Sequence, residues 1–378
     1  MNKLNNRPPF LPSEFIAAHY LCYRNHDIML EMLRSGEKHG VFNAEYPFRD
    51  EADRHSFEES EDIFTWLSET KREEERVDLL RRTIFPAVLS DFLHFVYEAL
   101  ACSGKAKLTV AFALLRKPLQ ENLHLLESIA TDFDSFAAKL ATEPHRLSAG
   151  GSGGLSAHQK RIDIAINQID ETDRFDGEYL AVLRYDKRNK DSFAHVFDTA
   201  IHLFTDNHAI RTEPMNINFI FSDNESRWSQ WSYIYSRLPY VLTYARLLFE
   251  HVLAAVKKTD PKYIEDMERR LSASTLLWSE TISEEYIVPP LTKFINATKS
   301  RLDSQCESQG YRVPSARDLD QLADTGRMPG ETFLSAYTRN MSYGARATAA
   351  KAVRQAVGFA QRLGSRKHSD EDADLHGK

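Results

Sequence analysis

Residues 225–258 read ESRWSQWSYIYSRLPYVLTYARLLFEHVLAAVKK and form the longest helical pattern in the chain. Aromatic and aliphatic side chains recur in this stretch at the three- and four-residue spacing of a helix face. Pro239 lies inside the pattern and predicts a kink, because proline removes one hydrogen bond of the helix backbone. The stretch therefore predicts a long helix, and the segments on both sides decide whether the whole chain is helical.

Those neighbouring segments repeat the helical spacing over most of the chain. The predicted helices cover residues 13–35, 60–103, 105–126, 132–140, 157–169, 177–183, 191–204, 261–277, 284–306 and 331–363. Gly36 is expected to end the first of them, and Pro86 to kink or divide the second. Residues 37–60 are acidic and aromatic without a period, which predicts an ordered loop.

A β-sheet has little support in this sequence. Residues 216–221 (NINFIF) alternate and predict either one short strand or an extended loop. Strands do not alternate with helices along the chain, which excludes a doubly wound sheet or a (β/α)-barrel. We therefore expect a mainly α, multi-helix, two-lobed assembly with at most one short strand or extended segment.

The composition excludes several classes of protein. The chain has 378 residues, 42% of them hydrophobic and 27% charged, which excludes collagen-like, coiled-coil-only and wholly disordered proteins. Lysine and arginine number 48 against 55 acidic residues, so no overall basic field attracts nucleic acid or an anionic membrane. A single core rarely serves more than about 300 residues, so we expect two lobes.

The cysteines and the apolar segments indicate the cellular compartment in which the protein is expected. Three cysteines without close spacing exclude a disulfide framework and a thiolate zinc module, and favour a reducing cytosol. Residues 1–12 lack the apolar stretch of a secretory signal, and residues 238–256 carry too many polar groups for a membrane span. We expect a cytoplasmic protein with no membrane partner.

One glycine- and serine-rich segment, residues 148–156 (SAGGSGGLS), interrupts the helical patterns. Such residues bury little surface to offset the entropy of ordering them, so the segment predicts a flexible loop between domains. It lacks the lysine of a phosphate-binding loop. The predicted organisation is a helical lobe at 1–147, this loop, a second helical lobe at 157–364 and a disordered tail at 365–378.

The candidate chemistry lies in residues 186–206, DKRNKDSFAHVFDTAIHLFTD. Acidic and imidazole side chains recur there every three or four residues, beside an apolar stripe, and are expected to share one helix face. They are Asp191, His195, Asp198, His202 and Asp206. An acid beside an imidazole sets its tautomer and raises its pKa, which prepares it for acid–base chemistry.

Cationic side chains come just before this predicted helix. They are Arg184, Lys187, Arg188 and Lys190. Positive side chains at the positive end of a helix dipole favour a bound phosphate. Arginine and histidine recur at a similar separation elsewhere, but only Arg188 combines a polar following residue with a helix start.

Arg188-Asn189 followed by His195 resembles the arginine–polar–spacer–histidine motif of HEPN-type helical proteins, many of which are metal-independent ribonucleases in toxin–antitoxin and anti-phage systems. The resemblance implies that Arg188 stabilises charge on the scissile phosphate and that Asn189 orients the pair. It implies that His195 acts as general base or acid on the ribose hydroxyl, without a cofactor. Lys187, Lys190 and Arg184 would bind the substrate, with Asp191, Asp198 and His202 in support. RNA, a second copy of the chain and a small protein are the implied partners.

Two other interpretations of the same helix remain open. A histidine–aspartate ladder is commonly a solvated face or a set of hydrogen bonds between helices, which would suit a non-catalytic interaction or sensor protein. Alternatively, His195, Asp198 and His202 could bind a metal with further ligands from another helix. Those ligands would be Glu121, His124 and Glu127, which include one Glu-x-x-His unit where carboxylate-bridged bundles use two.

Overall fold

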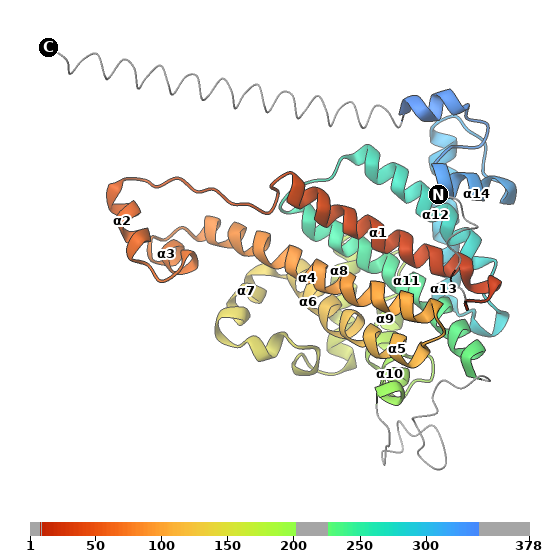
Figure 1. Cartoon of the computed structure of the whole chain (residues 1–378), viewed down its shortest axis with the longest axis horizontal. Coiled ribbons are helices and arrows are strands. Elements are labelled where there is room, and N and C mark those ends of the chain that lie inside the picture. The colour runs from red at the N-terminus through yellow and green to blue at the C-terminus, as the bar shows by residue number, and fades with distance from the viewer. Residues whose placement is uncertain (1–7, 9, 202–225, 340–378) are drawn as a thin grey trace. The chain divides into compact units, whose positions relative to one another are not determined.

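The computed structural model describes residues 8, 10–201 and 226–339, and in these ranges the chain is helical without any strand. Its α-helices are α1 (Ile16–Lys38), α2 (Glu51–Glu59), α3 (Ile63–Glu69), α4 (Glu73–Gly104), α5 (Leu108–Arg116), α6 (Leu123–Thr131), α7 (Phe133–Thr142), α8 (Leu155–Gln168), α9 (Gly177–Tyr185), α10 (Phe193–Ile201), α11 (Ser226–Ala254), α12 (Pro261–Ser279), α13 (Pro289–Ser308) and α14 (Ala316–Thr325). The prediction of a mainly α fold is confirmed (Figure 1). The predicted strand at 216–221 and the tail at 365–378 lie outside the described residues.

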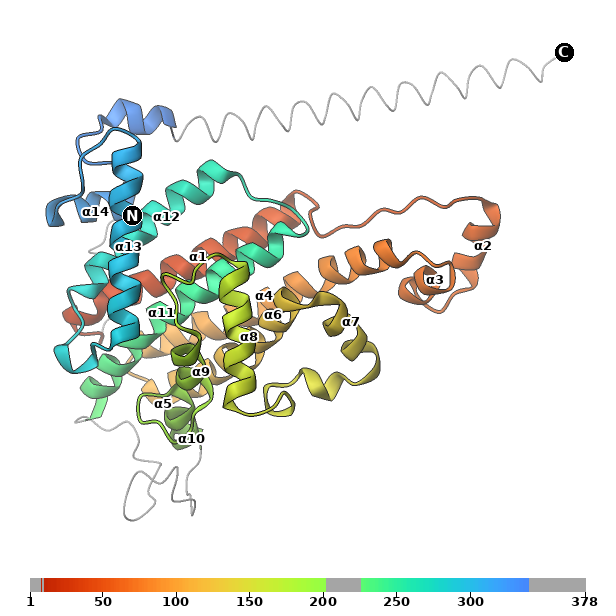
Figure 2. The ribbon, with the colours of Figure 1, turned by 180° about the vertical axis from the view of Figure 1, so that it is seen from behind.

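Helix α11 is the centre of the first of two compact units. It packs against α1, α4 and α6, and Figures 1 and 2 both show α1 and α11 side by side. Between Trp231 and Phe249 it is buried on almost every side. Pro239 leaves the carbonyl of Tyr235 without its helical donor, and the Trp278 indole N–H donates to that oxygen at 2.7 Å. The helix therefore continues through its proline.

The two units divide the chain differently from the predicted lobes. The first unit comprises residues 1–259 and 271–302, and the second comprises residues 260–270 and 303–378, of which 340–378 are not described. Residues 148–156 thus lie within the first unit. Ala149 is buried in a 3₁₀ turn there, and the Ser152 hydroxyl lies 2.8 Å from His124 Nε2. Hydrogen bonds order this segment even though its sequence predicts mobility.

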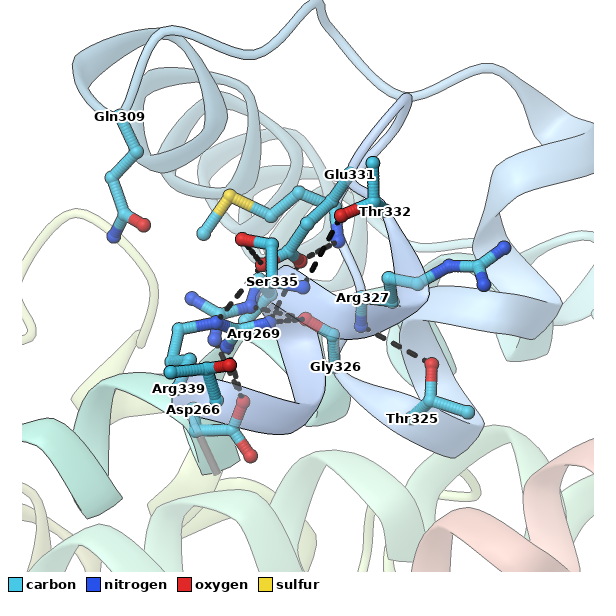
Figure 3. A network of polar contacts seen from close by, with 12 residues as sticks. Asp266, Arg269, Gln309, Thr325, Gly326, Arg327, Glu331, Thr332, Ser335 and Arg339 are labelled. Atoms are coloured by element: carbon cyan, nitrogen blue, oxygen red, sulfur yellow. Dashed lines mark hydrogen bonds and ion pairs between the residues drawn. The ribbon is translucent and has the colours of Figure 1, made fainter. Parts of the chain in front are cut away.

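The second unit is organised around the buried carboxylate of Asp266 (Figure 3). Arg269 and Arg339 donate to its Oδ1 at 2.7 and 2.9 Å. Arg339 also donates to Glu331 at 2.8 Å, and Arg269 donates to the carbonyl of Gly326 at 2.9 Å. Gly326 ends α14 in the left-handed conformation that glycine adopts without steric cost. These bonds join α12, the end of α14 and the helical residues 333–339 within this unit.

Several predicted boundaries are wrong. Gly36 lies inside α1, where the ring of Phe42 packs so closely that a Cβ atom would meet it at 2.4 Å. Helix α2 occupies part of the predicted loop at 37–60, with Asp50 as its N-cap. Pro86 does not divide the helix, since α4 continues from Glu73 to Gly104.

The single predicted helix at 60–103 is two helices, α3 and α4. Lys71 separates them with a φ of 57°, and the Arg72 amide donates to the carbonyl of Leu67 at 2.8 Å. This is the backbone pattern of a left-handed helix end, which usually carries glycine. Because lysine occupies the position here, no glycine marks the end of α3.

Helix α4 is the one described helix that is long and apolar enough to cross a membrane, by length and composition alone. The structure buries 44% of its apolar window, and core helices of soluble proteins meet the same criterion.

Candidate functional site

A turn of polar and charged residues, 186–192, connects α9 to α10. Asp186 Oδ1 accepts the Arg188 amide at 3.0 Å, and Asn189 Oδ1 accepts the Asp191 amide at 2.9 Å. Aspartate and asparagine favour such turns because their side chains replace a backbone acceptor. Asn189 therefore shapes the turn on which Arg188 is exposed.

The imidazole of His195, in the first turns of α10, is fixed against this connection. His195 Nδ1 lies 3.0 Å from the carbonyl oxygen of Lys187. A carbonyl oxygen only accepts, so Nδ1 carries the hydrogen and Nε2 of the neutral ring keeps the lone pair. The ring is partly exposed. Because Arg188 follows Lys187 directly, guanidinium and imidazole belong to the same short, folded segment.

Three of the predicted cationic side chains are exposed. Lys187 forms an ion pair with Asp198 at 2.6 Å and remains about half exposed. The side chains of Arg188 and Lys190 are exposed and make no ion pair with any residue that the structure describes. They leave positive charge at the start of α10, where a phosphate oxygen is favoured.

Arg184 differs from the prediction, because its side chain is fully buried. Its guanidinium pairs with Glu127 and donates to the carbonyl of Leu119 at 2.6 Å and to the Tyr185 hydroxyl at 2.6 Å. Leu119 lies in the π-helical turn between α5 and α6, residues Lys117–Asn122. Arg184 thus connects α9 to this turn and is not available to a substrate.

The acidic residues of the predicted histidine–aspartate ladder also make structural contacts within the fold. Asp191 accepts from Arg237 Nε at 2.8 Å and from the Tyr179 hydroxyl at 3.0 Å. Asp198 is only 4% exposed, and its carboxylate forms the ion pair with Lys187. His202 and Asp206 lie outside the described residues. The structure therefore brings His195, Arg188 and Asn189 into one segment, whereas Asp191 and Asp198 hold that segment in place.

A second polar cluster surrounds the buried carboxylate of Glu127, on α6. Besides Arg184, it accepts from Arg161 at 3.3 Å and from the Tyr244 hydroxyl at 3.2 Å. Nearby His124 is buried, and its burial followed by the charges of Arg161 and Arg184 lowers its pKa to about 2. His124 is therefore neutral at physiological pH.

This cluster borders a cavity of about 300 Å³ between α6, α7, α8 and residues 146–152. Most of the lining side chains are polar or charged. The lining residues are His124, Ser128, Thr131, Asp132, Ser135, Phe136, Lys139, Arg146, Leu147, Gly151, Ser152 and Arg161.

The metal interpretation finds no matching arrangement in the residues that the structure describes. No group of three or more His, Cys, Asp or Glu side chains is placed there to hold an ion. Glu127 pairs with arginines, Glu121 accepts the Ala149 amide at 3.1 Å, and His124 contacts Ser152.

The sequence did not predict this cavity. Of the possible metal ligands Glu121, His124 and Glu127, which their spacing on one helix singled out, only His124 lines it. Lys139, Arg146 and Arg161 come from three other segments, and no spacing rule connects residues that only tertiary packing brings together.

Comparison with known proteins adds no relative: no protein-family model, curated protein or solved structure matches the chain. The resemblance to HEPN-type proteins stays a prediction.

Proposed function

We propose that the protein is a HEPN-like, metal-independent ribonuclease whose general base is His195. The observation that supports this proposal is the hydrogen bond from His195 Nδ1 to the Lys187 carbonyl, 3.0 Å long. It leaves Nε2 as the proton acceptor on a partly exposed ring, which is the form a general base needs. Arg188, exposed on the adjoining turn, supplies the positive charge.

In the proposed reaction, His195 Nε2 accepts the proton of a ribose 2′-hydroxyl. The 2′-oxygen forms a bond to the neighbouring phosphorus, and the bond from phosphorus to the 5′-oxygen breaks. The proton returns through water to that leaving oxygen, which gives a cyclic phosphate end and a 5′-hydroxyl end. Arg188 stabilises the negative charge that builds on the phosphate oxygens, and Lys190 binds a neighbouring phosphate.

The test is incubation of RNA with the purified full chain in EDTA. We expect cleavage by the wild type, and a decrease of at least about 100-fold for His195→Ala, as loss of a general base predicts. His55→Ala is the matched control, because His55 is an exposed histidine on α2 with a side chain 70% exposed. No cleavage by the wild type, or equal cleavage by wild type and His195→Ala, refutes the proposal.

The alternative is a non-catalytic helical interaction protein, and one observation favours it. Arg184, which the resemblance implied as a substrate-binding residue, joins α9 to α6 through Glu127. Asp191 and Asp198 hold the turn 186–192 against α11 and α10. If this alternative is correct, RNA stays intact in EDTA when it is incubated with the wild type or with either variant. The nuclease proposal includes a homodimer and a small protein partner, as the resemblance implies. It also includes the cytoplasmic location that the cysteines favour.

A further inference from the structure

The cavity between α6, α7 and α8 has the charge of an anion-binding site. Lys139, Arg146 and Arg161 line it, whereas Asp132 is the one carboxylate in its lining. Asp132 Oδ1 already accepts the Ser135 amide at 2.9 Å as the N-cap of α7. The lining therefore has an excess of positive charge.

The pairing of these cations leaves much of that charge uncompensated. Arg161 shares the Glu127 carboxylate with the fully buried Arg184, so two guanidinium groups face one negative charge. Arg146 has one exposed ion pair with Glu143 at 3.3 Å. The ammonium group of Lys139 makes no hydrogen bond or ion pair with any residue that the structure describes. Excess positive charge in a partly buried site favours an anionic partner.

Neutral polar groups in the lining add hydrogen-bonding capacity. The Ser152 hydroxyl lies 2.6 Å from the carbonyl of Ser148, to which it donates its single hydrogen. It can then only accept from His124 Nε2, which leaves His124 Nδ1 as an acceptor. That Nδ1 is buried and has no partner among the described residues. Because that atom is itself buried, a ligand in the cavity does not reach it. The hydroxyls of Ser128 and Thr131, also in the lining, donate their hydrogens to the carbonyls of His124 and Glu127, and their oxygens remain as acceptors.

The cavity also has the volume of a small-molecule site. At about 300 Å³ it falls at the lower end of the range for pockets that enclose small ligands. Phe136 and Leu147 contribute apolar surface beside the charged groups. The charge and apolar surface of the cavity suit a compact organic anion, and its volume is too small for a folded protein.

We propose that this cavity binds a small phosphate-bearing organic molecule of about the size of a nucleoside monophosphate. Lys139, Arg146 and Arg161 hold the phosphate, and the hydroxyl oxygens of Ser128 and Thr131 accept from a hydroxyl or amino group of the ligand. The site shares no lining residue with the turn of Arg188 and His195, so this proposal does not depend on the ribonuclease proposal.

Calorimetric titration of the full chain with AMP, adenosine and inorganic phosphate tests the proposal. We expect saturable binding of AMP, weaker binding of phosphate, and binding of adenosine at least about tenfold weaker than AMP. The absence of binding by AMP and phosphate up to about 10 mM overturns the proposal. Equal affinity for AMP and adenosine also overturns it, because the phosphate would then contribute nothing.

Matched variants locate the binding. Lys139 and Arg146 are exposed, so the double variant Lys139→Gln/Arg146→Gln should fold, and we expect it to weaken AMP binding at least about tenfold. Lys160→Gln is the control, because Lys160 is exposed on α8 beside Arg161 and does not line the cavity. Unchanged AMP affinity in the folded double variant, or equal losses in the double variant and the control, overturns the assignment. Thermal unfolding of each variant without ligand verifies folding.

Discussion

Glu127 shows how one residue can organise several helices. Its carboxylate is fully buried and accepts from Arg184, Arg161 and Tyr244, which lie on three different helices. Removal of a buried carboxylate of this kind lowers the stability of the fold, because it leaves buried guanidinium charge without compensation.

We therefore expect Glu127→Gln to lower the free energy of unfolding by about 3 kcal/mol, measured by urea denaturation. The matched control is Glu98→Gln, which changes an exposed glutamate on α4 and should cost less than about 0.5 kcal/mol. Equal effects of the two variants would show that Arg161 and Arg184 find other partners.

His19 makes the stability of the fold depend on pH. It is buried on α1, with Nδ1 2.7 Å from the Tyr235 hydroxyl, and its burial lowers its pKa from 6.5 to about 4. Between these two values the unfolded chain binds a proton at this residue and the folded chain does not. The contribution of His19 to stability is therefore complete above pH 6.5 and decreases as the pH falls towards about 4.

The measurement is the free energy of unfolding in urea at several pH values from 7.5 down to 4.5. We expect His19→Gln to reduce the slope of stability against pH by up to about 1.4 kcal/mol per pH unit, the effect of one proton. His55→Gln, which changes an exposed histidine, should leave the slope unchanged. An unaltered slope in His19→Gln would contradict the stated cause.

At this scale the sequence predicted the types of residue better than their surroundings. Arg188 is exposed as the motif requires, whereas Arg184 has the same charge and is fully buried. Arg184 falls on the face of α9 that also carries Leu180 and Leu183, both buried. The helical spacing therefore indicated that Arg184 is buried, but it did not show that Glu127 on α6 is its partner.

Among the elements, α10 is the one on which the proposed chemistry depends. Its first turn is held by Ser192, whose buried hydroxyl accepts the Ala194 amide and donates to the carbonyl of Leu183, each at 3.1 Å. The hydroxyl thus fixes the start of α10 and its packing on α9 at the same time.

We expect Ser192→Ala to cost about 1–2 kcal/mol and to speed amide hydrogen exchange in α10, because it removes both bonds. Ser156→Ala changes an exposed serine on α8 and serves as the control, with an expected effect below about 0.5 kcal/mol. If α10 exchanges at the wild-type rate in Ser192→Ala, other contacts hold the helix start.

The existence of most helices could be predicted from periodicity, but several of their ends could not. The boundary between α3 and α4 depends on Lys71 in a conformation usually given to glycine, and Gly36 is helical because Phe42 packs on it. Helix α14 was not predicted, although Ser315 and Asp318 form a capping box at its start. Its buried residues Leu319, Leu322 and Ala323 also have helical spacing, so the sequence carried both signals for this helix.

For the whole molecule, the division into units could not be predicted from composition. Residues 148–156 have the composition of a linker, yet the structure orders them within the first unit. The second unit joins residues 260–270 to residues from 303 onward, which are distant in sequence. Such a unit has no boundary signal in the chain, because its contacts are long-range.

The second unit should unfold separately when its centre is removed. Asp266 is the carboxylate that Arg269 and Arg339 share, and Arg269 is only 1% exposed. Asp266→Ala leaves that buried guanidinium without its counter-charge, so we expect a local loss of about 3–5 kcal/mol. Hydrogen exchange followed by mass spectrometry should then be faster in residues 303–339, while α4 and α11 keep wild-type rates. Glu307→Gln, an exposed change in the same unit, should leave both sets of rates unchanged. An equal increase in α4 and α11 would mean that the two units unfold as one.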